Sequence, residues 1–176
     1  MERLVERLAE TRIGSTFNFY REGEGADLRR QRLTTYLRER RSAQILLVGE
    51  AAGYRGARVS GLPFTSERQL SGHGPAEASA TIVHRVLAEL GLEGSVLLWN
   101  LVPTHPHLPG EPLTNRRPTR SEIADSRCFL HELAPGRRTV AVGRLAEREL
   151  CGAYVRHPSH GGAHAFRKGL IEALDA

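Results

Sequence analysis

The stretch from Ile45 to Glu67 reads ILLVGEAAGYRGARVSGLPFTSE, and it decides the fold. Four apolar residues, typical of a buried strand, run into a loop with several glycines. Dinucleotide-binding loops need the spacing G-x-G-x-x-G, and P-loops need Gly-Lys-Ser/Thr. This loop has the spacing G-x-x-x-G between Gly49 and Gly53 and contains no lysine. The sequence therefore excludes both nucleotide motifs here, whereas a general anion nest at a helix start stays open.

Helical and strand patterns alternate along the rest of the chain. We expect helices at 2–11, 26–40, 76–90, 119–133, 144–150 and 165–174, and strands at 44–48, 95–99, 138–142 and 153–156. The proline-rich segment 101–118 is predicted to be a long surface loop. Strands separated by helices predict an α/β fold of three layers, with a central four-stranded parallel sheet between helices. We expect one domain over residues 1–176, with an N-terminal helical region at 1–42.

Composition narrows the class of protein. The 176 residues carry a net charge of +5 with 40% hydrophobic residues, which argues against a disordered chain. No apolar run approaches the length of a membrane span, and the charged N-terminus does not resemble a signal peptide. Two cysteines are too few for a disulfide framework, so we expect a cytoplasmic, nucleoid-associated protein. No long apolar seam is visible, so we expect a monomer. The positive net charge favours a nucleic-acid partner. Almost all of the basic residues are arginines, however, so a bias in genomic base composition explains the charge equally well.

Polar or glycine-rich residues follow each predicted strand. Ligands of parallel sheets bind beyond the carboxyl ends of the strands, so these segments are expected to meet in one site. The segments are Gly49–Gly53, Asn100, Gly143–Arg144 and His157–Gly162.

Three residues of these loops suit a flat, planar ligand. Phe64 can form the floor of a pocket, or it can be an ordinary core residue. The Asn100 amide has an acceptor and two donors, which match a base edge with N–H beside C=O such as that of uracil, or it can simply end a strand. His157, followed by Pro-Ser on a loop, can donate to a ligand or can make a structural hydrogen bond.

The motifs around these residues resemble those of the uracil-DNA glycosylase superfamily. The matching segments are GEAAG at 49–53, GLPFTSE at 61–67, LLWN at 97–100, NRRPTRSEI at 115–123 and HPSHGG at 157–162. They follow the family order and are most similar to the branch with GEAPG motifs. The resemblance covers residues 45–166 and implies a small parallel sheet flanked by helices. It also implies an enzyme that flips a uracil out of DNA and hydrolyses its bond to deoxyribose.

The resemblance assigns roles to several residues. Phe64 would stack on uracil, Asn100 would read N3 and O4, and His157 would hydrogen-bond O2 as charge develops on the leaving base. The remaining uracil-binding candidates are Ala51, Gly53 and Tyr54. The candidate DNA contacts are Ser159, His160, Gly161, Gly162, Arg116, Arg117, Arg120 and Arg144. Each of these arginines could equally be a solvated surface residue.

The chain departs from the best-known branch at the residue that orients the attacking water. That branch has an aspartate where this chain has Ala51. Glu50 is the favoured replacement as the second catalytic residue, although it could instead bond loop amides. Backbone carbonyls, Glu67 and His73 are the alternatives.

Discrimination against thymine is a second open question. The best-known branch excludes the thymine methyl with a tyrosine, and this chain has Gly53 at that place, followed by Tyr54. Tyr54 could serve instead, or the pocket could be roomier. The residues after His160 are small, so the wedge that fills the gap in the DNA stack is reduced, which favours single-stranded or loosened substrates.

We expect no metal and no cofactor. Of the four cysteines that hold an iron–sulfur cluster in the GEAPG branch, only Cys128 has a counterpart, while Thr104 and His105 fall near another. The histidines at 105, 107, 157, 160 and 164 have no converging acidic or thiol partner in the sequence pattern. Lys168, the single lysine, lies beyond the second motif, so a lyase step through an amine is not expected.

The sequence thus predicts a monofunctional uracil-DNA glycosylase that acts on single- or double-stranded DNA. Two alternatives stay open. One is a glycosylase for another base, such as hypoxanthine or 5-hydroxymethyluracil, because of the substitutions at Ala51 and Gly53. The other is a module that binds uracil or abasic DNA without cutting, because the usual acid is missing.

Overall fold

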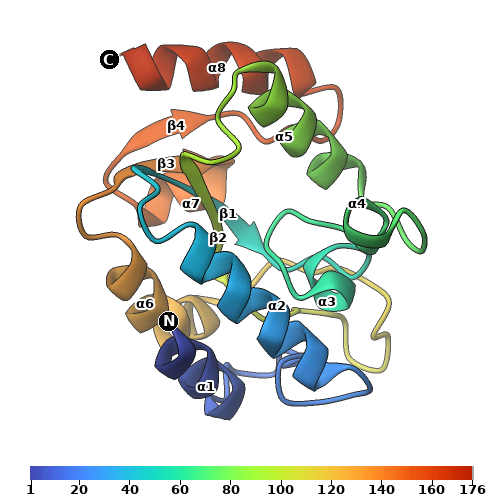
Figure 1. Ribbon diagram of the computed structural model, residues 1–176. Helices are drawn as coiled ribbons and strands as arrows, with labels where there is room; N and C mark the ends of the chain where they lie inside the picture. The colour runs from blue at the N-terminus through green and yellow to red at the C-terminus, as the bar shows by residue number, and fades with distance from the viewer. Residues whose placement is uncertain (176) are drawn as a thin grey trace.

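The computed structural model describes residues 1–175, and its centre is a four-stranded parallel sheet (Figure 1). The strand order is β2-β1-β3-β4. The strands are β1 (Ile45–Ala51), β2 (Val96–Val102), β3 (Arg138–Val142) and β4 (Ala153–Val155). The helices are α1 (Glu2–Glu10), α2 (Ala26–Glu39), α3 (Ala57–Ser60), α4 (Glu67–Ser71), α5 (Ala78–Glu89), α6 (Arg120–Leu133), α7 (Arg144–Glu149) and α8 (Ala163–Asp175).

Helices cover both faces of the sheet, so the predicted three-layer α/β fold is confirmed. Figure 1 shows α5 and α8 on one side and α1, α2 and α6 on the other. Successive strand residues point to opposite faces, so Leu46 and Val48 enter one core while Leu47 enters the other. Both faces of the central strands are therefore apolar, as parallel sheets require.

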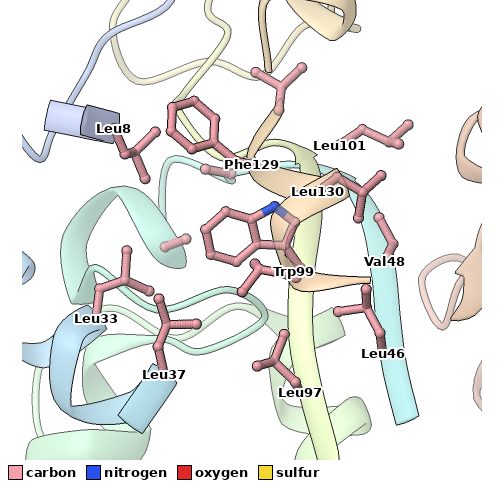
Figure 2. Close-up of a cluster of buried hydrophobic side chains, with 14 of the residues drawn as sticks. Leu8, Leu33, Leu37, Leu46, Val48, Leu97, Trp99, Leu101, Phe129 and Leu130 are labelled. Carbon is pink, nitrogen blue, oxygen red and sulfur yellow. The ribbon is translucent and has the colours of Figure 1, made fainter. Parts of the chain in front are cut away.

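Trp99 is at the centre of the larger core. Its indole is fully buried between the sheet and the leucines of α1 and α2, with Phe129 of α6 nearby (Figure 2). The second core joins α5 and α8 to the other face through residues such as Val83, Phe166 and Leu170. These two cores fix the strand ends from which the loops of the site emerge.

Helix α6 begins with the capping box that the sequence predicts. The Thr119 side chain accepts from the backbone N–H of Glu122, and the Glu122 carboxylate accepts from the backbone N–H of Thr119. Glu122 also pairs with Arg116 and is 1% exposed. Burial would raise the pKa of Glu122, but these hydrogen bonds and the Arg116 charge outweigh burial and lower it to about 2.

The prediction of a surface loop over 101–118 is wrong for its first part. Strand β2 continues to Val102, and residues 103–106 are buried. His105 exchanges two backbone hydrogen bonds with Phe17, which ties this part of the segment to the N-terminal region. Two short helices, α3 and α4, were not anticipated, because four or five residues are too few to show a period. Within residues 1–175, no helix has the length and apolar character that crossing a membrane requires.

Candidate active site

A cleft of about 500 Å³ lies at the carboxyl ends of the strands. Its walls come from the segments after β1, β2, β3 and β4, as the order of polar residues in the sequence predicts. Ten of the candidate site residues named from the sequence line it: Glu50, Ala51, Gly53, Phe64, Asn100, Arg116, Arg117, Arg144, His157 and Ser159.

Phe64 and Asn100 meet above Gly49. Gly49 and Asn100 are paired in the register of β1 and β2. A Cβ placed on Gly49 would lie 2.3 Å from Cζ of Phe64 and 2.9 Å from Oδ1 of Asn100. A glycine is therefore required at 49, because any side chain would displace the phenyl ring or the amide. Phe64 and Asn100 therefore lie close together, and both line the cleft.

Phe64 is held in an unusual backbone conformation. Its φ is +51°, which is uncommon for a residue other than glycine and occurs where the surrounding structure enforces it. Here the Ser60 hydroxyl accepts from the N–H of Leu62 at 3.0 Å and donates to the carbonyl of Thr65 at 2.6 Å. The Tyr20 hydroxyl donates to the carbonyl of Gly61 at 2.8 Å. Sequence reasoning missed both residues, because Tyr20 is distant from every motif and Ser60 precedes the segment 61–67 without belonging to it.

His157 is oriented by Ser159, two residues along the same loop. The backbone N–H of Ser159 donates to Nδ1 of His157 at 3.2 Å, and the Ser159 hydroxyl is 2.8 Å from the same nitrogen. Nδ1 is thus an acceptor, so the proton of the neutral ring is on Nε2. Burial, with a smaller contribution from His160, lowers the pKa of His157 and keeps the ring neutral. The arrangement presents one neutral N–H donor in the cleft.

Two carboxyl groups line the cleft, and the sequence analysis named only Glu50. Burial raises the pKa of Glu50, and the Arg117 charge partly offsets this effect. Glu77, the residue before α5, also lines the cleft, and burial raises the pKa of its carboxyl group. The Glu77 carboxylate rests against the backbone of Gly53 and Gly56. No motif contains Glu77, so sequence pattern alone gave no signal for it.

His105 supports the loop after β1 from beneath. Its side chain is fully buried, and Nδ1 is 2.9 Å from the carbonyl oxygen of Ala52. The N–H of Ala52 bonds in turn to the carbonyl of Val102, so the GEAAG segment is tied to β2. Among residues 1–175, no three His, Cys, Asp or Glu side chains converge as a metal site would require.

The arginines of the cleft differ in whether their guanidinium groups are already paired with protein groups. Arg116 forms two hydrogen bonds with the Glu122 carboxylate, at 2.6 and 2.8 Å, so its guanidinium is already engaged. Arg144 pairs with Glu147 and lies 4.5 Å from the centre of the Tyr154 ring. Arg117 is exposed beside Glu50, and Arg148, which was not singled out from the sequence, lines the cleft on α7.

Several predicted residues lie outside the cleft lining. Glu67 is bonded to Arg32 at 2.7 and 3.0 Å, and His73 is exposed, so neither alternative water-holding residue lines the cleft. Arg120 is exposed at the first turn of α6. The others that do not line the cleft are Tyr54, His160, Gly161 and Gly162, the last of which packs against the carbonyl of His157.

Comparison with known proteins decides the family. The model of the uracil DNA glycosylase superfamily matches residues 38–173 of the chain. The chain belongs to this superfamily. No curated protein matched it. Among solved structures, SMUG2 of Pedobacter heparinus is similar at 13% identity with a TM-score of 0.69, covering 99% of this chain and 96% of that one.

The family membership confirms the resemblance drawn from the sequence motifs. The likeness to the Pedobacter structure extends over nearly the whole chain and confirms the fold, including the N-terminal helices that precede the matched motifs. Membership makes the chain a DNA glycosylase, a hydrolase of DNA repair.

Proposed function

We propose that the protein is a monofunctional uracil-DNA glycosylase. The observation that carries this proposal is the convergence of Phe64, Asn100 and His157 on one cleft. An aromatic floor, an amide and a neutral N–H donor are the groups that a planar base with N–H beside C=O needs.

The base is read by its edge. With the ring stacked on Phe64, the Asn100 amide accepts from N3–H and donates to O4 of uracil. Asn100 is 4% exposed, and among residues 1–175 no recorded side-chain hydrogen bond occupies its amide. In this orientation of the amide, a cytosine would place its N3 acceptor against Oδ1 and its N4 donor against Nδ2, so both contacts would be mismatched. Such a buried mismatch costs a large part of the binding energy.

The reaction breaks the bond between N1 of uracil and C1′ of deoxyribose. The electron pair of this bond moves onto the base and is shared with O2, while the water oxygen forms a new bond to C1′. His157 donates from Nε2 to O2 as the negative charge grows there. A donor aimed at developing charge typically contributes about 3 kcal/mol to the transition state.

Glu50 is the proposed acceptor of the proton that the water loses. It lines the cleft at the end of β1, next to Ala51, and burial raises its pKa toward the range suited to a general base. The positive charge of Arg117 beside it partly offsets this rise and favours the ionised carboxylate. The proton then passes from the carboxyl group to solvent.

A lyase step is not part of the proposal. Such a step needs an amine near the sugar. Lys168 is on α8, where it pairs with Glu172 at 3.6 Å with a side chain 69% exposed, and it does not line the cleft. We therefore expect an intact abasic strand as the product.

The proposed contacts to DNA phosphates are three arginines that line the cleft: Arg117, Arg144 and Arg148. The loop from Ser159 to Gly162 is proposed to approach the sugar-phosphate backbone of the DNA closely. Gly161 is exposed with φ +74°, so this position of the loop offers no side chain to fill a gap in a duplex, and the residues that follow His160 are small. The proposal therefore includes a preference for single-stranded DNA.

The experiment is excision from a labelled oligonucleotide with one uracil, either single-stranded or opposite guanine or adenine. The proposal predicts free uracil and strand breaks that appear only after alkali. Breaks without alkali would contradict the monofunctional assignment. Tight binding without release of uracil would instead indicate a module that recognises damage. Release of hypoxanthine or 5-hydroxymethyluracil from matched oligonucleotides, without release of uracil, would identify a different substrate.

A further inference from the structure

Gly53 contributes no side chain to the wall of the cleft, and the neighbouring tyrosine does not take its place. Tyr54 does not line the cleft. Its backbone N–H donates to Oδ1 of Asn115 at 3.0 Å, and the Arg55 guanidinium lies 5.2 Å from the centre of its ring. Tyr54 is therefore held beside the neighbouring loop and not over the base site.

Glu77 occupies the space beside Gly53. A Cβ on Gly53 would lie 2.3 Å from Oε1 of Glu77, and a Cβ on Gly56 would lie 2.0 Å from Oε2. The carboxyl group thus takes the volume that a side chain at 53 would need, although it comes from the start of α5. Among residues 1–175, no recorded hydrogen bond or ion pair engages this carboxyl group, and it lines the cleft.

Ring connectivity shows which atom of the base faces this wall. In the proposed pose O2 is at His157, while N3 and O4 are at Asn100. C5 is directly across the ring from C2, which carries O2, so C5 points away from His157 and toward the side of the base that faces β1 and β2. His157 follows β4, beyond β3, whereas Gly53 follows β1, which lies between β2 and β3 in the sheet. The wall formed by Gly53 and Glu77 is therefore placed to face C5.

We infer that Glu77 is the residue that excludes thymine from the site. Thymine differs from uracil only by a methyl group on C5, and the Glu77 carboxyl group fills the space that this methyl would enter. The exclusion is partly steric and partly a matter of solvation, because an apolar methyl pressed on a carboxyl group removes water without supplying a hydrogen bond. The inference rests on the proposed function and names a specificity residue for it.

The test compares release of uracil and of thymine from matched single-stranded oligonucleotides. The variants are Glu77→Ala, which opens the wall, and Glu77→Gln, which keeps its volume without the charge. Tyr54→Ala tests the tyrosine, and Glu93→Ala, in the exposed turn between α5 and β2, is the matched control. Single-turnover rates with each base give a uracil-to-thymine ratio for every protein. Circular dichroism and thermal melting verify that each variant is folded.

We expect the wild type to release uracil far faster than thymine. Glu77→Ala should lower the uracil-to-thymine ratio by about 10- to 100-fold, since one methyl group in a pocket is typically worth this much. Glu77→Gln should keep the ratio within a few-fold, and the uracil rate should remain measurable in both variants. Tyr54→Ala and Glu93→Ala should leave the ratio unchanged.

Three results would overturn the inference while leaving the proposed function intact. The first is a uracil-to-thymine ratio that stays unchanged in Glu77→Ala. The second is a ratio that falls in Tyr54→Ala instead. The third is that Glu77→Gln and Glu77→Ala both lose uracil release completely. The last result would make Glu77 part of the hydrolytic chemistry. A folded wild type that releases no uracil would refute the proposed function and the inference together, so the two failures are distinguishable.

Discussion

The backbone N–H of Ser159 lies 3.2 Å from Nδ1 of His157, and this contact determines which ring nitrogen carries the proton. A backbone N–H can only donate, so Nδ1 must accept, and the neutral imidazole has its proton on Nε2. The site thereby obtains a fixed donor without a positive charge that would need a counter-ion.

The protonation state of His157 can be measured directly. We expect the Nε2–H tautomer at pH 7 and a titration midpoint below 6.5, because burial lowers the pKa. Long-range ¹H–¹⁵N correlation spectra of the ring report both quantities, with His157→Gln used to assign the signals. A midpoint above 6.5, or a proton on Nδ1, would contradict the arrangement.

Gly49→Ala tests the close packing of Phe64 and Asn100. The added Cβ would approach Cζ of Phe64 to 2.3 Å, so we expect uracil release to fall by about 100-fold as the ring is displaced. Gly94→Ala is the matched control, because nothing lies within 4 Å of a Cβ at that position. Equal activity of the two variants would show that the Phe64 ring is not part of the base site.

Asn100→Asp tests the reading of the base edge. A carboxylate cannot donate to O4, so uracil release should fall by at least about 100-fold, and some cytosine release should appear. Rates on matched uracil and cytosine oligonucleotides provide the measurement. Unchanged uracil release would remove Asn100 from the recognition of the base.

Glu122→Gln tests the support beneath the Arg116 segment. Because the pKa of Glu122 is lowered to about 2, its contribution is present above pH 4.5 and is lost as the pH falls toward 2. Breaking this buried pair should reduce the free energy of unfolding by about 3 kcal/mol at pH 7. Glu132→Gln, in the exposed pair with Arg7, should change it by less than about 1 kcal/mol. Urea titrations at pH 7 and pH 3 should show the Glu122→Gln deficit shrinking at the lower pH, and a constant deficit would contradict the assignment.

The sequence predicted the parts of the fold that depend on local pattern. The apolar runs of β1 and β2, the capping box at Thr119 and the polar residues after each strand all have short-range signatures. The position of the cleft followed from them, because parallel strands bring their carboxyl ends together.

Other features were beyond sequence reasoning because they depend on residues distant in the chain. The hydroxyl of Tyr20 holds Gly61 across 41 positions, and His105 bonds Ala52 across 53. Glu77 reaches the cleft only because the start of α5 packs against the Gly53 loop. None of these contacts leaves a periodic or motif signal.

The central claim is that His157 stabilises the departing uracil in this cleft, and His157→Ala tests it most directly. Single-turnover release of uracil from a single-stranded oligonucleotide should fall by about 100- to 1,000-fold in His157→Ala, as is typical when one donor to a developing oxyanion is removed. His164→Ala, which alters an exposed histidine at the start of α8, should release uracil at the wild-type rate. Uracil release by a folded His157→Ala protein at the wild-type rate would contradict the account.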